Sequence, residues 1–297
     1  MKTMLGDEVF ALERDQLRGL AYRMIGSVTD AEDVVQDAWL RWQSCEQSKV
    51  DNPKHFITRI VTNLCLDRLR VNKKNRALYV GSWLPESSLD SFSAADSADP
   101  EHIQQVADDI TVAFMLALER LTASERAAFI LHDVFAYDFN ELATIMDRSA
   151  ASCRQLASRA RKALQTDKPR SAATVDEGAR LAHAFQDAVR DGDINALTEL
   201  LSKDAVFISD GGGKVIAVPA PVIGGKKIAT MLLGFAKFYR DKQDIRTTLT
   251  TINGLPGFIL WDKTGPVQTL VLENSAEGRI DKIYVVRNPE KLQHLKD

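Results

Sequence analysis

The chain has 297 residues, of which 45% are hydrophobic and 27% charged, and its formal net charge is −3 at pH 7. This length predicts two or three domains, and the composition excludes wholesale disorder and the fibrous and collagen-like classes. No apolar run approaches the ~20 residues of a spanning helix, and the N-terminal stretch turns acidic too early for a signal peptide, so we expect a cytoplasmic protein without a membrane partner.

The charge is distributed unevenly along the chain. Residues 54–76 and residues 148–170 each hold seven Lys or Arg against one Asp, a net charge of +6, whereas residues 83–110 hold seven acids and no cation. Two basic segments joined by an acidic one predict two footprints on a single polyanion. Either basic segment alone is better explained as a solvated helix face, and the polyanion interpretation depends on the two occurring together.

Apolar residues at helical spacing predict helices over residues 7–24, 29–42 and 53–70. Thr29 and Glu32 have the spacing of a capping box at the start of the second helix, and Asn52 before Pro53 marks the start of the third. The polar face of the second helix carries Asp33, Gln36, Asp37 and Arg41. The third helix has, opposite its core face, a row of side chains that can contact phosphates and bases: Arg59, Asn63, Asp67 and Arg70.

Residues 77–108 lose this periodicity and gain Ser, Asp and Pro, which predicts an acidic linker. One apolar group interrupts it, at Trp83, Leu84, Pro85 and Glu86. A Trp in an otherwise polar linker usually packs against another surface, although a lone exposed Trp is the alternative.

Helical periodicity resumes at residue 109, with a second capping box at Thr122 and Glu125. A short helix at 139–147, a turn and a basic helix at 149–164 predict a helix-turn-helix, a pattern that helical hairpins in general share. The apolar stripe of the basic helix leaves one set of polar side chains outside it, which could enter a major groove: Ser152, Arg154, Gln155, Ser158 and Arg159.

After a short link at residues 169–175, the pattern changes to that of an α+β domain. Helices are predicted over residues 176–190, 193–202 and 225–240, and strands follow that are rich in β-branched and aromatic residues. We expect the strands to form a curved antiparallel sheet.

No cofactor or metal site is predicted. Cys45, Cys65 and Cys153 are widely spaced and form no CxxC pair, so they predict neither a disulfide framework nor a zinc site. The DGGGK string at 210–214 predicts a tight backbone turn, with an anion-holding nest at Lys214 as the alternative. No catalytic residue is predicted, because the candidates for an acid–base pair lack motif-like spacing: His183, Asp187, Asp210, Tyr239, Asp262 and Tyr284.

Taken together, residues 1–168 resemble a bacterial sigma factor of the extracytoplasmic-function group, which has only the second and fourth conserved sigma regions. The resemblance lies in DAEDVVQDAWLRW, NPKHFITRIVTNLCLDRLR and the segment from Leu121 to Leu164, in the family's order. Residues 176–297 resemble a SnoaL-like domain, an α+β cone of the NTF2-like class. Three strings are similar to the signature of the sigma factor J-like subgroup, in which a fused domain replaces a separate anti-sigma protein: WLPE at 83–86, DGGGK at 210–214 and NPEKL at 288–292.

The resemblance implies five parts: region 2 at 1–76, the acidic linker at 77–108, region 4 at 109–168, a link at 169–175 and the SnoaL-like regulatory domain at 176–297. The expected partners are promoter DNA and core RNA polymerase, through its β′ clamp helices and β flap. The family's clamp-binding positions correspond to Asp33, Gln36, Asp37, Leu40 and Arg41, with Trp42 beside them. The −10 element would be bound by Arg59, Asn63, Asp67 and Arg70, and the −35 element by Ser152, Arg154, Gln155, Ser158 and Arg159.

The same resemblance implies regulation in cis, without a separate anti-sigma factor and with room for an unidentified small-molecule ligand. We expect WLPE to dock on the C-terminal domain, although Ser87 stands where relatives commonly have a second Pro. The residues assigned to this regulation are Trp83, Leu84, Pro85, Glu86, Asp210, Gly211, Gly212, Gly213, Lys214, Asn288, Pro289, Glu290, Lys291 and Leu292. The alternatives are a free-standing helix-turn-helix regulator with a ligand domain and, behind it, an isomerase-type or hydratase-type enzyme.

Overall fold

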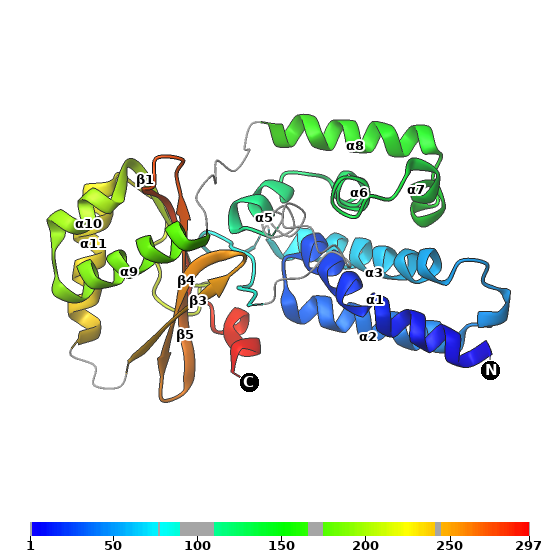
Figure 1. Ribbon diagram of the computed structural model, residues 1–297, viewed down its shortest axis with the longest axis horizontal. Coiled ribbons are helices and arrows are strands. Elements are labelled where there is room, and N and C mark those ends of the chain that lie inside the picture. Colours follow the sequence, from blue (N-terminus) through cyan, green and yellow to red (C-terminus); the bar gives the residue numbers. More distant parts are fainter. Residues whose placement is uncertain (1, 77, 90–109, 166–174, 241–244, 297) are drawn as a thin grey trace. The chain divides into compact units, whose positions relative to one another are not determined.

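The structure, a computed structural model, describes residues 2–76, 78–89, 110–165, 175–240 and 245–296 (Figure 1). Its contacts divide the chain into two compact units, the first of residues 1–78 and 91–168 and the second of residues 79–90 and 169–297. Residues 79–89 of the predicted acidic linker therefore belong to the C-terminal unit. Residues 90–108 of that linker lie outside the described residues.

The described part of the first unit is helical, as predicted. Its elements are α1 (Lys2–Ile25), α2 (Val28–Ser44), η1 (Gln47–Lys49), α3 (Pro53–Arg76), α5 (Val112–Leu118), α6 (Ala123–Phe129), η2 (Ile130–Val134), α7 (Phe139–Met146) and α8 (Ala150–Leu164). The helix α6 continues into η2, a π-helical turn that ends at the turn before α7. The predicted short helix, turn and basic helix are α7 and α8.

The helix ends follow the predicted capping chemistry with one correction. The capping box at Thr122 is present, and Asn52 accepts a hydrogen bond from the amide of His55 at 3.1 Å. The predicted capping box at Thr29 is wrong, because α2 begins two residues earlier and Ser27 is its N-cap. Gly26 has a φ of 78°, which ends α1 and leaves the extended Ser27 as the residue whose hydroxyl reaches the first turn.

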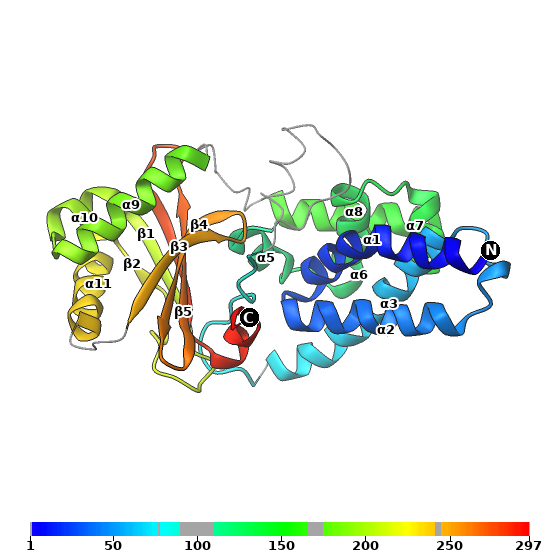
Figure 2. The ribbon, with the colours of Figure 1, turned by 60° about the horizontal axis from the view of Figure 1, so that its bottom comes forward.

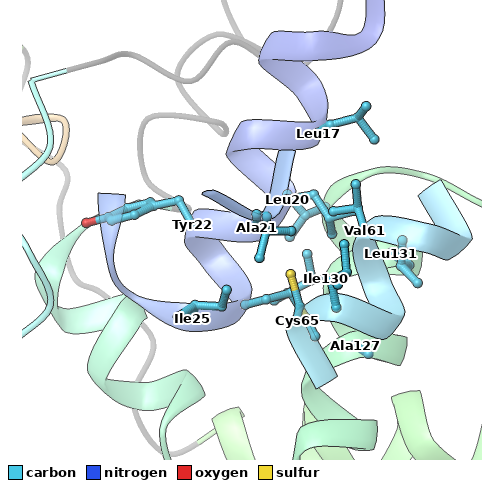
Figure 3. Close-up of a cluster of buried hydrophobic side chains, with 14 of the residues drawn as sticks. Leu17, Leu20, Ala21, Tyr22, Ile25, Val61, Cys65, Ala127, Ile130 and Leu131 are labelled. Atoms are coloured by element: carbon cyan, nitrogen blue, oxygen red, sulfur yellow. The ribbon is translucent and has the colours of Figure 1, made fainter. Parts of the chain in front are cut away.

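One continuous apolar core joins the early and late helices of this unit. Figure 3 shows side chains of α1, α3, α6 and η2 gathered where these helices meet, and the labelled ones are all buried. Each buried Leu, Ile or Val among them stabilises the fold by about 1.5–3 kcal/mol relative to an exposed one. The labelled residues are Leu17, Leu20, Ala21, Tyr22, Ile25, Val61, Cys65, Ala127, Ile130 and Leu131.

Polar contacts reinforce this joint between α1–α3 and α6–α8. The buried guanidinium of Arg126 donates to the carbonyl oxygen of Met24 at 2.7 Å and pairs with Glu119 at 2.8 Å. Burial lowers the pKa of Arg126 to about 10. The hydroxyls of Thr58 and Tyr137 lie 3.1 Å apart. The two sigma-like segments are therefore one packed body within this unit.

The second unit has helices first and a sheet after, as predicted. Its elements are α9 (Val175–Asp191), α10 (Ile194–Leu200), β1 (Leu201–Asp210), β2 (Val222–Ile223), α11 (Gly225–Arg240), β3 (Arg246–Ile252), β4 (Leu255–Asp262), β5 (Gly265–Asn274), β6 (Ile280–Val286) and η4 (Pro289–Leu295). The helices α9, α10 and α11 lie on one side of the sheet in both views (Figures 1 and 2). Apolar side chains such as Phe185 and Phe258, with ring centroids 6.0 Å apart, fill the space between helices and sheet.

The sheet is mixed, so the prediction of an antiparallel sheet is wrong at one pairing. The strand order is β2-β1-β6-β5-β4-β3, and β1 pairs with β6 in parallel, with Phe207 opposite Ile283. Neighbouring parallel strands need a long crossover, which here comprises α11 and the strands β2, β3, β4 and β5. Residues 211–221, between β1 and β2, lie outside the sheet, and Pro219 and Pro221 in this segment offer no amide for strand pairing.

Candidate functional site

The predicted −10 row lies along one side of α3. Asn63, Asp67 and Arg70 are exposed and Arg59 is half-buried, and spacings of three or four residues bring them onto one helix face. Arg70 and Asp67 form an ion pair along the helix. Arg59 lies 3.7 Å from the carboxylate of Asp147, which ends α7. This face offers cations for phosphates and an amide for a base edge.

The predicted −35 residues lie on the outer face of α8. Arg154, Gln155, Ser158 and Arg159 are exposed and Ser152 is half-buried, whereas Cys153, Ala157 and Ala160 pack inward. The side chain of Ser149 caps the helix by accepting from the amide of Ser152 at 3.2 Å. The guanidinium of Arg154 lies 5.3 Å above the ring of Phe139, so α7 supports this cation where α8 begins. The surface combines groups that could read bases with cations that could contact phosphates.

The predicted polymerase-binding face of α2 is open. Asp33, Gln36, Asp37, Leu40 and Arg41 are all exposed, and Leu40 has 59% of its surface accessible. A single exposed Leu is common on protein surfaces, so the structure shows this face as accessible to a partner without marking it as a binding surface.

Trp42, which the resemblance places beside these residues, is not on that surface. It is fully buried and its ring lies 5.9 Å from that of Phe56. The helical period explains this burial, because Trp42 lies on the same face of α2 as the buried Val35 and Ala38.

In the C-terminal unit, the WLPE, DGGGK and NPEKL strings meet at one buried carboxylate. Asp210 is fully buried at the end of β1. Its oxygens accept from the hydroxyl of Tyr79 at 2.6 Å, the amide of Leu84 at 2.9 Å, the amide of Gly212 at 2.9 Å and the ammonium of Lys291 at 2.7 Å. Four donors satisfy the charge that burial would otherwise make costly.

Lys291 completes this cluster from the NPEKL string. Its ammonium also donates to the carbonyl oxygen of Leu84, and it lies 4.3 Å from the ring centroid of Trp83 and 5.0 Å from that of Tyr79. Two aromatic faces and a carboxylate therefore surround one ammonium group. Burial and the neighbouring Asp210 carboxylate raise the pKa of the Tyr79 phenol.

The glycines of DGGGK shape the turn that makes room for these contacts. Gly212 and Gly213 have φ values of +60° and +69°, and a Cβ on Gly213 would meet the Val80 side chain at 3.0 Å. Gly211 has an ordinary φ, but a Cβ there would lie 2.6 Å from the carbonyl oxygen of Val215. The predicted tight turn is present, and in place of an external anion the Gly212 amide holds the carboxylate of Asp210.

A second set of contacts extends along the linker segment, by which we mean residues 79–89. The hydroxyls of Ser87 and Thr269 lie 2.6 Å apart, the amide of Ser88 donates to Asn253 at 3.1 Å, and a ring nitrogen of His294 lies 2.8 Å from the carbonyl oxygen of Ser87. Ser87 therefore forms a buried hydrogen bond in the place of the Pro common in relatives. Sequence inspection missed Tyr79, Asn253, Thr269 and His294, because no local pattern marks partners so distant along the chain.

The candidates for an acid–base pair do not gather in this unit. Asp210 belongs to the cluster above, Asp187 pairs with Arg190 at 2.8 Å, and Asp262 accepts from the amide of Thr264 at 2.7 Å. The hydroxyl of Tyr284 donates to Glu273 at 2.9 Å, and burial raises its pKa. His183 is exposed on α9, and the side chain of Tyr239 lies outside the described residues.

The described residues contain no group of three or more His, Cys, Asp or Glu side chains placed to hold a metal ion. None of the helices in the described ranges combines the length and apolar character needed to cross a membrane.

Comparison with known proteins gives the family. The model of Sigma-70 region 2 matches residues 9–75, and that of Sigma-70, region 4 matches residues 111–164. Over 95% of its length the chain is 34% identical to the ECF RNA polymerase sigma factor SigJ of Mycobacterium tuberculosis, in an alignment that covers 91% of that protein. The chain belongs to the extracytoplasmic-function (ECF) RNA polymerase sigma factors. An ECF sigma factor recognises promoters and directs transcription initiation as a subunit of RNA polymerase, and it is not an enzyme.

The similarity of this ECF sigma factor to its relatives extends through the C-terminal domain. It is 28% identical to the probable ECF sigma factor SigI of M. tuberculosis over 95% of this chain and 93% of that one. The crystal structure of M. tuberculosis SigJ superposes with a TM-score of 0.71 at 32% identity, over 96% of this chain and 97% of that one. The predicted fold class is confirmed as two helical sigma segments followed by an α+β domain, and the family decides against a free-standing regulator and an enzyme.

Proposed function

We propose that this ECF sigma factor reads its promoters through two helix faces and binds core polymerase through a third. The face of α3 with Arg59, Asn63, Asp67 and Arg70 would capture the −10 element, and the outer face of α8 the −35 element. The exposed face of α2 around Leu40 would bind the β′ clamp helices, and the region 4 segment the β flap. The exposure of these residues supports the proposal, because each can reach a partner without unfolding its helix. Because its proposed partners are RNA polymerase and promoter DNA, we infer that the protein acts in the cytoplasm.

The C-terminal domain is proposed to regulate the sigma segments in cis, without a separate anti-sigma factor. The observation that carries this proposal is the meeting of WLPE, DGGGK and NPEKL at the carboxylate of Asp210. The linker segment lies between regions 2 and 4 in sequence, so anchoring it shortens the chain that connects the two DNA-binding regions. A shorter connection limits how far apart regions 2 and 4 can move. It therefore shifts the populations of conformations that differ in promoter binding.

Run-off transcription with bacterial core RNA polymerase tests both proposals. The templates are a promoter library, and the proteins are the full-length chain, a form ending at Asp167 and a form ending at Arg287. Promoter-specific transcript from any form supports the sigma surfaces, and different yields from the three give the sign of regulation. Equal yields would remove the cis-regulatory proposal and leave promoter recognition in place. No transcript and no core binding from any form would refute the proposed surfaces.

A further inference from the structure

The C-terminal domain carries an open groove that the contacts around Asp210 do not use. It has a volume of about 890 Å³ and lies where the end of α10, the start of β1 and the first turns of α11 come together. Volumes of roughly 300–1,000 Å³ are usual for small-ligand sites. None of the residues lining it belongs to the WLPE, DGGGK or NPEKL strings. The groove is therefore distinct from the anchor of the linker segment.

The charged residues lining the groove are all cations. Lys203 comes from β1, Lys226 and Lys227 from α11, and Arg279 from the turn before β6, and no Asp or Glu lines the groove. Four like charges around one hollow repel one another and create a positive potential that an anion would relieve.

These four cations differ from others in the same domain. Lys214, Lys282 and Lys291 pair with Glu290, Glu273 and Asp210, and Arg190 pairs with Asp187 and Asp191. Across the ranges that the structure describes, no ion pair involves any of the four cations of the groove. Their charges are available to a ligand.

The start of α11 adds backbone donors to the same hollow. A Cβ on Gly225 would lie 2.6 Å from the carbonyl oxygen of Ser202, so a glycine is needed for the helix to begin this close to β1. Gly224 accepts from the amide of Ile228 at 3.0 Å and has no side chain to cap the first turn. The first amides of a helix without a side-chain cap are donors for an anion.

The other lining residues favour an organic ligand over a bare ion. Leu201 and Met231 give the groove an apolar part, and Thr198, Ser202 and Thr230 bring hydroxyls to it. We propose that this groove binds a small organic phosphate. The phosphate would lie against the cations and the first turn of α11, and its organic body against Leu201 and Met231. Four cations exceed the need of a single carboxylate and suit the two negative charges and three terminal oxygens of a phosphate monoester.

Isothermal titration calorimetry on the full-length chain tests this proposal. The probes are adenosine monophosphate, phenyl phosphate, inorganic phosphate and, as the ligand without phosphate, adenosine. We expect at least one of the two phosphate esters to bind with a Kd below about 1 mM, more tightly than inorganic phosphate, with adenosine not binding. The double substitution Lys226→Ala and Arg279→Ala should weaken binding at least about tenfold, since each removes a charge-assisted contact. Added salt should weaken it further.

The matched control is Lys237→Ala, which removes an exposed cation from the same helix outside the groove and should leave the Kd within about twofold. Three outcomes would each overturn the proposal: adenosine binding as tightly as adenosine monophosphate, an unchanged Kd in the double variant, or no binding of either phosphate ester. If a 30-base-pair DNA duplex is the only anion whose binding the double variant weakens, the groove contacts a DNA backbone and the proposal is also wrong. The assay contains no polymerase, so its outcome is independent of the proposed cis regulation.

Discussion

Replacing Asp210 by Ala would remove the acceptor at which the WLPE, DGGGK and NPEKL strings meet. The hydroxyl of Tyr79, the amide of Leu84 and the ammonium of Lys291 would each lose a buried hydrogen bond. Two of these donors belong to the linker segment, so we expect the substitution to release that segment from the C-terminal domain.

The size of the effect follows from the burial of the pair. Removing one partner of a buried ion pair costs about 3–5 kcal/mol, because the other charge stays in a poorly solvated site. In the variant, the Lys291 ammonium keeps its hydrogen bond to the carbonyl oxygen of Leu84 and its contacts with two aromatic rings, which favours the lower end of this energy range. The Lys291 ammonium would become hydrated when the linker segment leaves. The lost free energy therefore appears as release of the linker segment rather than as unfolding of the whole domain. About 3 kcal/mol corresponds to a roughly 100-fold rise in the released fraction.

Hydrogen exchange followed by mass spectrometry measures this release. In the native protein the amides of Leu84 and Ser88 are both hydrogen-bonded within the second unit. Peptides from the linker segment should exchange about 100-fold faster in the Asp210→Ala variant, whereas peptides from β4 and β5 should keep their protection. A second variant, Lys291→Met, should shift exchange the same way by a smaller factor, since Asp210 would retain three donors.

Lys214→Ala is the matched control, because it breaks an ion pair between the same two strings, DGGGK and NPEKL. Its ammonium pairs with Glu290, and both side chains are about half exposed, at 47% and 62%. Exposed pairs contribute at most about 1 kcal/mol, so little release is expected. The reasoning would be refuted if Asp210→Ala released the linker segment no more than Lys214→Ala does. Uniform loss of protection across the domain would also contradict it, by showing that the pair supports the whole fold.

Three further predictions concern the sigma segments. Arg159→Ala should cost about 1–3 kcal/mol of discrimination at one base pair of the −35 element, whereas Lys162→Ala should weaken all promoters alike; competition binding by the holoenzyme to single-base variants separates the two. Leu40→Asp should lower affinity for core polymerase, measured by calorimetry, without lowering the melting temperature, because its side chain is 59% exposed; an unchanged affinity would remove α2 from the proposed interface. Thr122→Ala should reduce the free energy of unfolding by about 1 kcal/mol in urea titration, because it removes the capping box of α6, and no loss would show that the box is redundant.

Much of the helical half could be predicted from local patterns. Apolar spacing marked α2, α3 and α8, and short-range chemistry at Asn52 and Thr122 marked helix starts that the structure confirms. These features depend on neighbours within about one turn, so the sequence carries their information directly. The exposed rows on α2, α3 and α8 follow from the same period, once the buried stripe of each helix is known.

Contacts between distant residues could not be predicted in this way. The three strings were visible as motifs, but their meeting at one carboxylate joins Leu84 to Asp210 across 126 positions and Lys291 to Asp210 across 81. The parallel pairing of β1 with β6 and the burial of Trp42 likewise depend on which surfaces meet when the chain closes. Residue patterns specify which face of an element is apolar or charged, whereas packing of the whole chain selects the partner that covers it, because many surfaces of similar composition compete for that place.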